Sequence, residues 1–390
     1  MTVSGLESPM TFDVAIVGTG PDPTARDRTG FAMGYRHAAA YEQRDDCRLR
    51  ACVDLERSNA EAFARAHDMD DGSVFEDHRA MLSSIQPDIV SVCVPPSAHA
   101  EIVIDGARTP GVKAIHCEKP MANRWPACQE MVSTCARENV QLTIDHQRRL
   151  AKPVVRGKAL VDQGAIGEIR RVEWAEVNLF DAGSHCFDLC DLFVGGAHPE
   201  WVLAGVDVSE DTRWFGELNS TRAIAHWQYD NGVQGIASTS DGGATAIDAY
   251  LRVIGTEGEL EIQPDDGPPL RLRTDGGWQA VETDGENLFG PPGSRLRGAL
   301  AKVEEIMPGR APSGPVRPNY RRAIDHAVSC LENGREPTIS GITALRSTAL
   351  IFGAWESARS RGRVDFPLRD VENPLTDLRT SPSAAEVSEV

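Results

Sequence analysis

The strongest constraint on the fold is the regular alternation of short apolar runs with helical patterns over the first 146 residues. The apolar runs are rich in β-branched residues and have the length of buried strands, and the segments between them show the apolar spacing of helices. Strands that alternate with helices predict a parallel, doubly wound sheet. The predicted strands are 12–18, 48–54, 87–94, 112–119 and 140–146.

The pattern changes after about residue 147. One helix is predicted at 182–195, and alternating runs joined by turns follow it, with turn signals at Asp230-Asn231-Gly232 and at Gly255 and Gly258. This half is predicted as an α+β domain with a large, mostly antiparallel sheet. The stretch 264–318 is rich in Pro and Gly and predicts one or two long loops. The predicted organisation is a first domain at 1–146, a second at 147–369 and a tail at 370–390.

The charge balance limits the kinds of partner that the protein can bind. Acidic residues outnumber basic ones by 58 to 40, for a net charge of −18, and this argues against nucleic acid because phosphate binding requires a positive surface. Only five of the basic residues are lysines. The bias resembles proteins of salt-loving archaea, whose acidic surfaces are screened by dense counterions. A GC-rich genome that favours arginine codons explains the scarcity of lysine equally well.

The chain carries no sign of a membrane or secreted protein. No apolar run approaches the roughly 20 residues of a membrane span, and the N-terminus lacks the basic and apolar regions of a signal peptide. The nine cysteines match no zinc spacing and are expected to be reduced core thiols. A cytoplasmic protein without a metal site is therefore expected, and the helically spaced pair Cys186 and Cys190 is assigned to packing.

The first predicted strand ends in Gly18-Thr19-Gly20, a G-x-G that lets a dinucleotide pyrophosphate approach the backbone at a helix N-terminus. The third glycine of this fingerprint is missing at its usual place. If Gly34 takes its role, the loop carries an insertion of 11 residues. Asp54 ends the second strand, where a carboxylate binds the ribose hydroxyls of NAD and repels a 2′-phosphate. Taken singly, the glycines are also typical of a surface loop, and an aspartate in the position of Asp54 is also typical of a helix cap.

Two short motifs and several longer segments carry a family resemblance. The motifs are Glu118-Lys119-Pro120 and, about 60 residues later, Asp181-x-x-x-His185. Together with the strand and its glycines, they resemble the glucose-fructose oxidoreductase / inositol dehydrogenase / rhizopine catabolism (Gfo/Idh/MocA) family over nearly the whole chain. The other matching segments are MGYRHAAAY, VDLERSNAEAFA, Pro95-Pro96-Ser97-x-His99, HQRRLAKP, GAIGEIRRVE and VIGTEGELEI.

The resemblance implies a Rossmann domain that binds NAD or NADP and a second domain that binds a small sugar or polyol. It places Lys119 beside the nicotinamide and Asp181 and His185 opposite, as the catalytic residues. Oxidation of an alcohol needs a base at the hydroxyl and a cation near the developing alkoxide. A lysine serves as base if its pKa falls, and histidine titrates near neutrality already. The implied cofactor contacts are Gly18, Gly20, Gly34, Asp54, Pro95, Pro96, His99, Glu118 and Lys119.

Asp181 and His185 are four residues apart at the start of a predicted helix and share a face. The carboxylate can hold a substrate hydroxyl or orient the imidazole, and Asp188 is a second candidate for orienting it. The alternative reading of His185 is a structural histidine on a helix face. His116 and His146 are given that structural reading, and so is His99 except as a lining of the cofactor loop.

The substrate pocket departs from the family pattern. The stretch between the strand 169–177 and Asp181 is short, so the pocket is either more open or closed by 211–219 or by 286–320. Trp214 is the candidate for stacking against a sugar ring. Gln147 and Arg148 are candidates for substrate or cofactor contact. The alternative is that they are hinge residues between the two domains and have no role in ligand binding.

These observations predict an oxidoreductase that favours NAD over NADP and oxidises a secondary alcohol or hemiacetal of a sugar, inositol or polyol. Two alternatives remain open. One is a dinucleotide-binding sensor without turnover, and the other is an enzyme that recycles its cofactor between two sugars or cleaves glycosides. Because an antiparallel sheet with an uncovered face needs a partner, a homodimer or homotetramer is expected.

Overall fold

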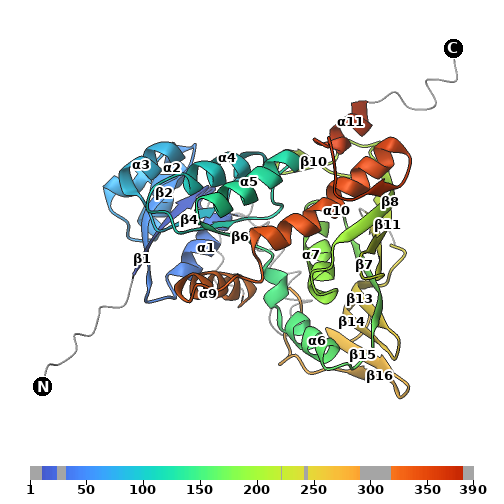
Figure 1. Cartoon of the computed structure of the whole chain (residues 1–390). Helices are drawn as coiled ribbons and strands as arrows, with labels where there is room; N and C mark the ends of the chain where they lie inside the picture. The colour runs from blue at the N-terminus through green and yellow to red at the C-terminus, as the bar shows by residue number, and fades with distance from the viewer. Residues whose placement is uncertain (1–10, 24–31, 221, 241–244, 290–317, 381–390) are drawn as a thin grey trace, which may run out of the picture.

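The computed structural model describes residues 11–23, 32–220, 222–240, 245–289 and 318–380. The chain forms two units that lie side by side and are joined along a central boundary (Figure 1). The first unit is built on a six-stranded sheet and the second on a nine-stranded sheet. The predicted combination of a parallel α/β unit and an α+β unit is confirmed.

All strands of the first sheet are parallel, in the order β3-β2-β1-β4-β5-β6. The strand order reverses between β1 and β4, and in such sheets ligands bind in the crevice outside the strand ends at this point. The central strands are nearly continuous apolar runs because both of their faces are buried. The strands are β1 Phe12–Val17, β2 Cys47–Val53, β3 Val74–Phe75, β4 Ile89–Val92, β5 Ala114–Cys117 and β6 Gln141–Ile144.

The helices of this unit cover both faces of the sheet (Figure 1). The start of α3 is fixed by a local N-cap. The Asp77 side chain accepts hydrogen bonds from the backbone N–H groups of Arg79 and Ala80, which have no partner within the helix. The strand β3 was not predicted because two residues are too few to give a pattern. The helices are α1 Met33–Tyr41, α2 Arg57–Ala66, α3 His78–Ile85, α4 Pro96–Ala107 and α5 Trp125–Arg137, with a 3-10 turn at Asp71–Ser73.

The second sheet has the order β16-β15-β14-β13-β7-β12-β11-β8-β17 and is antiparallel except for the pair β7 and β12. Both predicted turns are confirmed, because Gly232 has a φ of 82° between β11 and β12, and Gly255 N–H donates to Gly258 O between β13 and β14. The strands are β7 Ile169–Glu176, β8 Pro199–Asp207, β11 Arg222–Tyr229, β12 Gln234–Ser240, β13 Ala249–Gly255, β14 Glu259–Pro264, β15 Leu270–Thr274, β16 Gly277–Ala280 and β17 Val364–Asp365, and β9 Arg213–Trp214 with β10 Glu217–Leu218 forms a separate pair.

Helices cover one face of this sheet. They are α7 Gly183–Phe193 and α10 Gly341–Ser360, while α6 Lys152–Asp162 packs near β14. The 3-10 turn η2, Gln147–Leu150, connects the two units. The helix α9, Pro318–Glu332, returns to the first unit and packs beside α1. In the part of the chain that the structure describes, no helix is long and apolar enough to cross a membrane.

Two predictions concern irregular segments. The stretch 264–318 was expected to hold one or two long loops. Its first part contains the hairpin of β15 and β16, and 290–317 lies outside the described residues. The expected tail 370–390 begins instead with the helix α11, Pro374–Thr380, which packs on α10. Val371 and Leu375 are buried in that contact, and their apolar spacing was overlooked. Residues 381–390 are not described.

Candidate active site

The loop after β1 forms a cradle at the switch point of the first sheet. Gly18 and Gly20 have φ values of 89° and 69°, a region that favours glycine. A Cβ on Gly34 would lie 2.8 Å from the carbonyl oxygen of Gly18, so this glycine allows α1 to pack closely against the turn. Asp54 Oδ2 accepts hydrogen bonds from Gly20 N–H at 2.8 Å and from Thr19 Oγ1 at 3.0 Å. These residues fit a dinucleotide, whereas most of the inserted loop, 24–31, is not described.

Pro95, Pro96 and His99 were also predicted to contact the cofactor. Pro95 precedes α4 and Pro96 begins it, at the carboxyl end of β4. His99 is fully buried, and its ring nitrogens face the carbonyl oxygens of Val94 at 2.8 Å and Pro120 at 3.0 Å. The side chain of His99 therefore holds the loop after Lys119 in place, and its predicted cofactor contact is revised to an indirect one.

Lys119 and Asp181 meet across the boundary between the two units. Lys119 follows β5, and Asp181 precedes α7. The Lys119 Nζ donates to Asp181 Oδ1 at 2.6 Å and to the Asp181 carbonyl oxygen at 3.2 Å. Both side chains remain partly accessible, at 17% and 16% exposure. The pair is therefore accessible to a ligand while it links the two units.

His185 lies on the first turn of α7, almost completely buried. Its Nδ1 has no hydrogen-bond partner within the described ranges of the chain. Burial, followed by the positive charges of Arg148 and Lys119, holds the pKa of His185 well below its ordinary value. The imidazole is therefore neutral near pH 7, which is the form that can accept a proton.

Neither predicted orienting carboxylate binds His185. Asp181 pairs with Lys119, and Asp188 accepts from Arg149 Nε at 2.6 Å while its other oxygen lies 2.9 Å from His146 Nδ1. The ring of His146 packs edge-on against that of His185, with centroids 5.6 Å apart. His146 therefore lies between Asp188 and His185, and the helical spacing alone could not reveal this.

Arg148 and Gln147 lie where the sequence placed them, on the connection η2. Arg148 donates to the hydroxyl of Tyr250 and lies 3.5 Å from Glu176, and its guanidinium is 5.1 Å from the ring centroids of Tyr250 and Phe289. The Oε1 atom of buried Gln147 has no partner among the residues described. The sequence analysis missed Tyr250 and Glu176, because nothing in strands β13 and β7 distinguishes them from ordinary sheet residues.

Trp214 belongs to the small hairpin of β9 and β10, within the predicted closing segment 211–219. The hairpin contacts the first unit through Glu217, which accepts from Asn123 Nδ2 at 3.0 Å. The Trp214 side chain is 39% exposed and packs near Phe215. The contacts of the described residues do not link Trp214 to Lys119, Asp181 or His185. The other predicted closing segment, 286–320, lies mostly in undescribed residues.

The Rossmann sheet with its glycine cradle, followed by the large mostly antiparallel sheet, is typical of a two-domain, NAD-binding oxidoreductase. Residues 12–146 match the model of the oxidoreductase family NAD-binding Rossmann fold, and residues 158–366 match that of the oxidoreductase family C-terminal alpha/beta domain. The chain belongs to the Gfo/Idh/MocA oxidoreductase family.

Curated relatives of the chain include sugar and polyol dehydrogenases. It is 27% identical over 354 residues to inositol 2-dehydrogenase of Rhizobium meliloti, covering 86% of this chain and 96% of the relative. It is 25% identical over 368 residues to D-apiose dehydrogenase of Paraburkholderia graminis, covering 88% and 90%. Among solved structures, an Agrobacterium radiobacter oxidoreductase in complex with NAD⁺, L-tartaric acid and magnesium aligns with a TM-score of 0.70 at 18% identity, over 91% of this chain and 98% of that one.

Proposed function

We propose that this oxidoreductase transfers hydride between a nicotinamide cofactor, preferentially NAD, and a secondary alcohol or hemiacetal carbon of a sugar, inositol or related polyol. The observation that carries the proposal is the contact of Lys119 with Asp181 beside the neutral imidazole of His185. It supplies a cation, a carboxylate and a base within one crevice.

The residues have separate roles in this reaction. Bound NAD would supply the hydride acceptor at the mouth of the sheet. Lys119 and Asp181 bind and orient the substrate hydroxyl, and the lysine ammonium stabilises the alkoxide that develops as hydride leaves carbon. His185 accepts the hydroxyl proton, since its imidazole is neutral. Arg148 and Gln147 bind the remaining hydroxyls, and Trp214 in its hairpin is a stacking surface for the distal part of the sugar.

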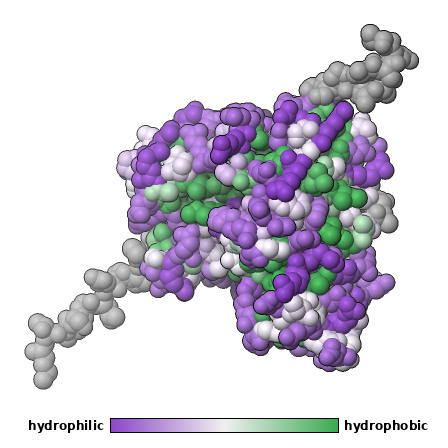
Figure 2. Space-filling view, turned by 45° about the vertical axis from the view of Figure 1, so that its right-hand side comes forward, coloured by the Kyte–Doolittle hydropathy of each residue, from purple (hydrophilic) through white to green (hydrophobic). Residues whose placement is uncertain are grey.

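The assembly proposed for the protein is a homodimer or homotetramer joined through the uncovered face of the second sheet. Leu203 on β8 and Ile224 on β11 point away from α7 and α10 and are 49% and 60% exposed. Figure 2 shows apolar patches that interrupt an otherwise hydrophilic surface. Burying such residues against a second copy removes apolar area from water. A reducing cytoplasm is the proposed location, in keeping with the nine free cysteines.

The experiment that tests this function is a panel of aldoses, polyols and inositols assayed with NAD and with NADP. A dehydrogenase releases one NADH for each substrate molecule oxidised. Internal recycling of the cofactor would give product without net NADH. A protein that binds NAD tightly but turns over none of the panel would favour the sensor alternative.

A further inference from the structure

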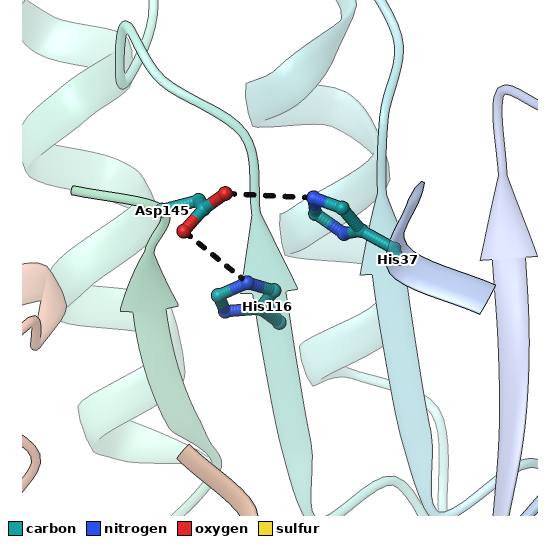
Figure 3. A group of neighbouring side chains, drawn as sticks. All are labelled: His37, His116 and Asp145. Carbon is teal, nitrogen blue, oxygen red and sulfur yellow. Dashed lines mark ion pairs between the residues drawn. The ribbon is translucent and has the colours of Figure 1, made fainter. Parts of the chain in front are cut away.

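A buried group of ionisable side chains lies next to Lys119 and takes no part in the proposed reaction. It consists of His37 on α1, His116 on β5 and Asp145 just after β6 (Figure 3), and Glu118 lies beside His37. These side chains come from segments far apart in the sequence. Their exposure is 0% for His37, 2% for His116, 1% for Asp145 and 7% for Glu118.

The two histidines are held with their Nδ1 atoms outward and their Nε2 atoms inward. His37 Nδ1 lies 2.9 Å from Ser91 Oγ, and His116 Nδ1 lies 2.8 Å from Thr143 Oγ1. Figure 3 shows both rings directed toward the carboxylate of Asp145. Histidines that bind metals are usually oriented in this way, by a hydrogen bond to the ring nitrogen that does not bind the ion.

The inward atoms are spaced too widely for strong hydrogen bonds. His37 Nε2 is 3.5 Å from Asp145 Oδ2, and His116 Nε2 is 3.8 Å from Asp145 Oδ1, whereas charge-assisted bonds are about 2.7–2.9 Å long. Around a tetrahedral ion with bonds of about 2.0–2.2 Å, neighbouring ligand atoms lie about 3.4 Å apart. His116 Nε2 and Asp145 Oδ1 have no hydrogen-bond partner in the described part of the chain.

The charges of the group also match a dication. Two carboxylates, Asp145 and Glu118, are buried here, both within 3.5 Å of His37 Nε2, and buried carboxylates require a neighbouring cation. Glu118 Oε1 lies 3.1 Å from His37 Nε2, at the edge of the group.

We propose that His37, His116 and Asp145 bind a divalent transition-metal ion, for which zinc has the best-fitting ligand preference. Because the group is buried and takes no part in the proposed reaction, the site is structural. The ion would hold α1, β5 and β6 together beneath the cofactor cradle. The sequence analysis expected no metal site, because it weighed cysteine spacing and not these separated residues.

The first test is the metal content of the whole protein, expressed in zinc-supplemented medium and purified without chelators. Elemental analysis is expected to find about one ion per chain, and X-ray absorption at the zinc edge is expected to show nitrogen and oxygen ligands without sulfur. His116→Gln and Asp145→Asn should each lose the ion. The matched control is His78→Gln, in an exposed group with Glu101 and Asp105 that could hold an ion adventitiously. Loss of the ion in His78→Gln alone would overturn the proposal.

The second test covers the case in which the variants fail to fold. Wild-type protein is unfolded in guanidinium with chelator and refolded with Zn²⁺, with Mg²⁺ or with no metal, because a buried ion has to enter during folding. A higher Tm only in the zinc sample is expected. Equal Tm values in all three samples, together with wild-type protein that carries under about one ion per ten chains, would show that protons alone bridge the cluster.

Discussion

Lys119 of the nucleotide-binding unit and Asp181 of the second unit are joined by a 2.6 Å ion pair across the boundary between them. The contact brings the two motifs to one point although 62 residues separate them in the chain. In the proposed reaction, a substrate hydroxyl bound here would replace part of this contact. Substrate binding and the positions of the two units would then be coupled at Lys119.

The catalytic assignment predicts large losses of kcat in two variants. Lys119→Met and His185→Ala should each lower kcat by at least about 10²-fold, since general acid–base assistance is worth about 10²- to 10⁴-fold. NAD affinity, measured by fluorescence, should change little in His185→Ala because this residue belongs to the second unit. The matched control is His198→Ala, an exposed histidine on a loop. Near-native kcat in both variants would refute the assignment.

A conservative change at Asp181 separates binding from proton transfer. Asp181→Asn keeps the size of the side chain but removes the charge that holds Lys119. We expect a higher KM together with a lower kcat, since both the position of the hydroxyl and the orientation of the lysine are altered. Steady-state kinetics with the substrate found in the panel measures both. A lower kcat at unchanged KM would mean that Asp181 acts only in the transition state.

The buried environment of His185 predicts the pH dependence. Its lowered pKa keeps the imidazole neutral as the pH falls through 6.5, the ordinary histidine value. Activity should therefore persist below pH 6.5 and decline only when the lowered pKa is reached. In Arg148→Gln one nearby cation is lost, so the acid limb of the kcat/KM profile should move to higher pH. An acid limb above pH 6.5 in the wild type would contradict His185 as the base.

Cofactor choice should follow Asp54. We expect NAD to have the higher kcat/KM, because a carboxylate at the end of β2 repels a 2′-phosphate. Arg57 could attract that phosphate, but it is engaged by Glu61 at 2.9 Å and Glu76 at 3.4 Å. Asp54→Asn should narrow the preference, and Asp365→Asn, on β17 of the second unit, is the control. Initial rates measured with NAD and with NADP test this prediction. A wild-type preference for NADP would contradict the role assigned to Asp54.

The net charge of −18 predicts that salt stabilises the protein. Raising ionic strength from 0.1 M to 1 M shortens the Debye length from about 10 Å to about 3 Å and so screens the self-repulsion. Salt also weakens exposed pairs such as Arg79 with Glu101, but each of these contributes only about 0–1 kcal/mol. The Tm should rise between low salt and 2 M KCl. An unchanged Tm would leave codon bias as the explanation for the scarcity of lysine.

The proposed interface between subunits can be tested by introducing charged residues into it. Ile224→Glu and Leu203→Glu place carboxylates on the open face of the second sheet, where a dimer would bury them, and should shift the protein to a smaller species in light scattering. The control is Val155→Glu, an equally exposed apolar residue on α6. Assembly that persists in both sheet variants would locate the interface elsewhere.

The sequence predicted the parts of the fold that depend on local pattern. The strands β1 and β4 are short apolar runs buried on both faces, and the turn at Gly232 depends on its own residues. The partners of Asp188 could not be predicted in the same way. Helical spacing placed Asp188 near His185, but Arg149 and His146 approach from the connection η2 and take up both of its oxygens.

In the candidate site, too, the sequence predicts only what depends on local motifs. Lys119, Asp181 and His185 can be proposed from the sequence because their motifs are short and local. The group of His37, His116 and Asp145 could not be found, because no spacing along the chain relates α1 to the ends of β5 and β6. Only the packing of the sheet brings these three side chains within reach of one another.

The return of α9 to the first unit also affects how the protein is made. Ile324 and Val328 of this helix complete the core that contains Tyr41 and Ile89. While the ribosome is still adding the second unit, that part of the core has no cover. We therefore expect a chain released after residue 146 to aggregate, and the nucleotide-binding unit to reach its final stability only when residue 328 has emerged.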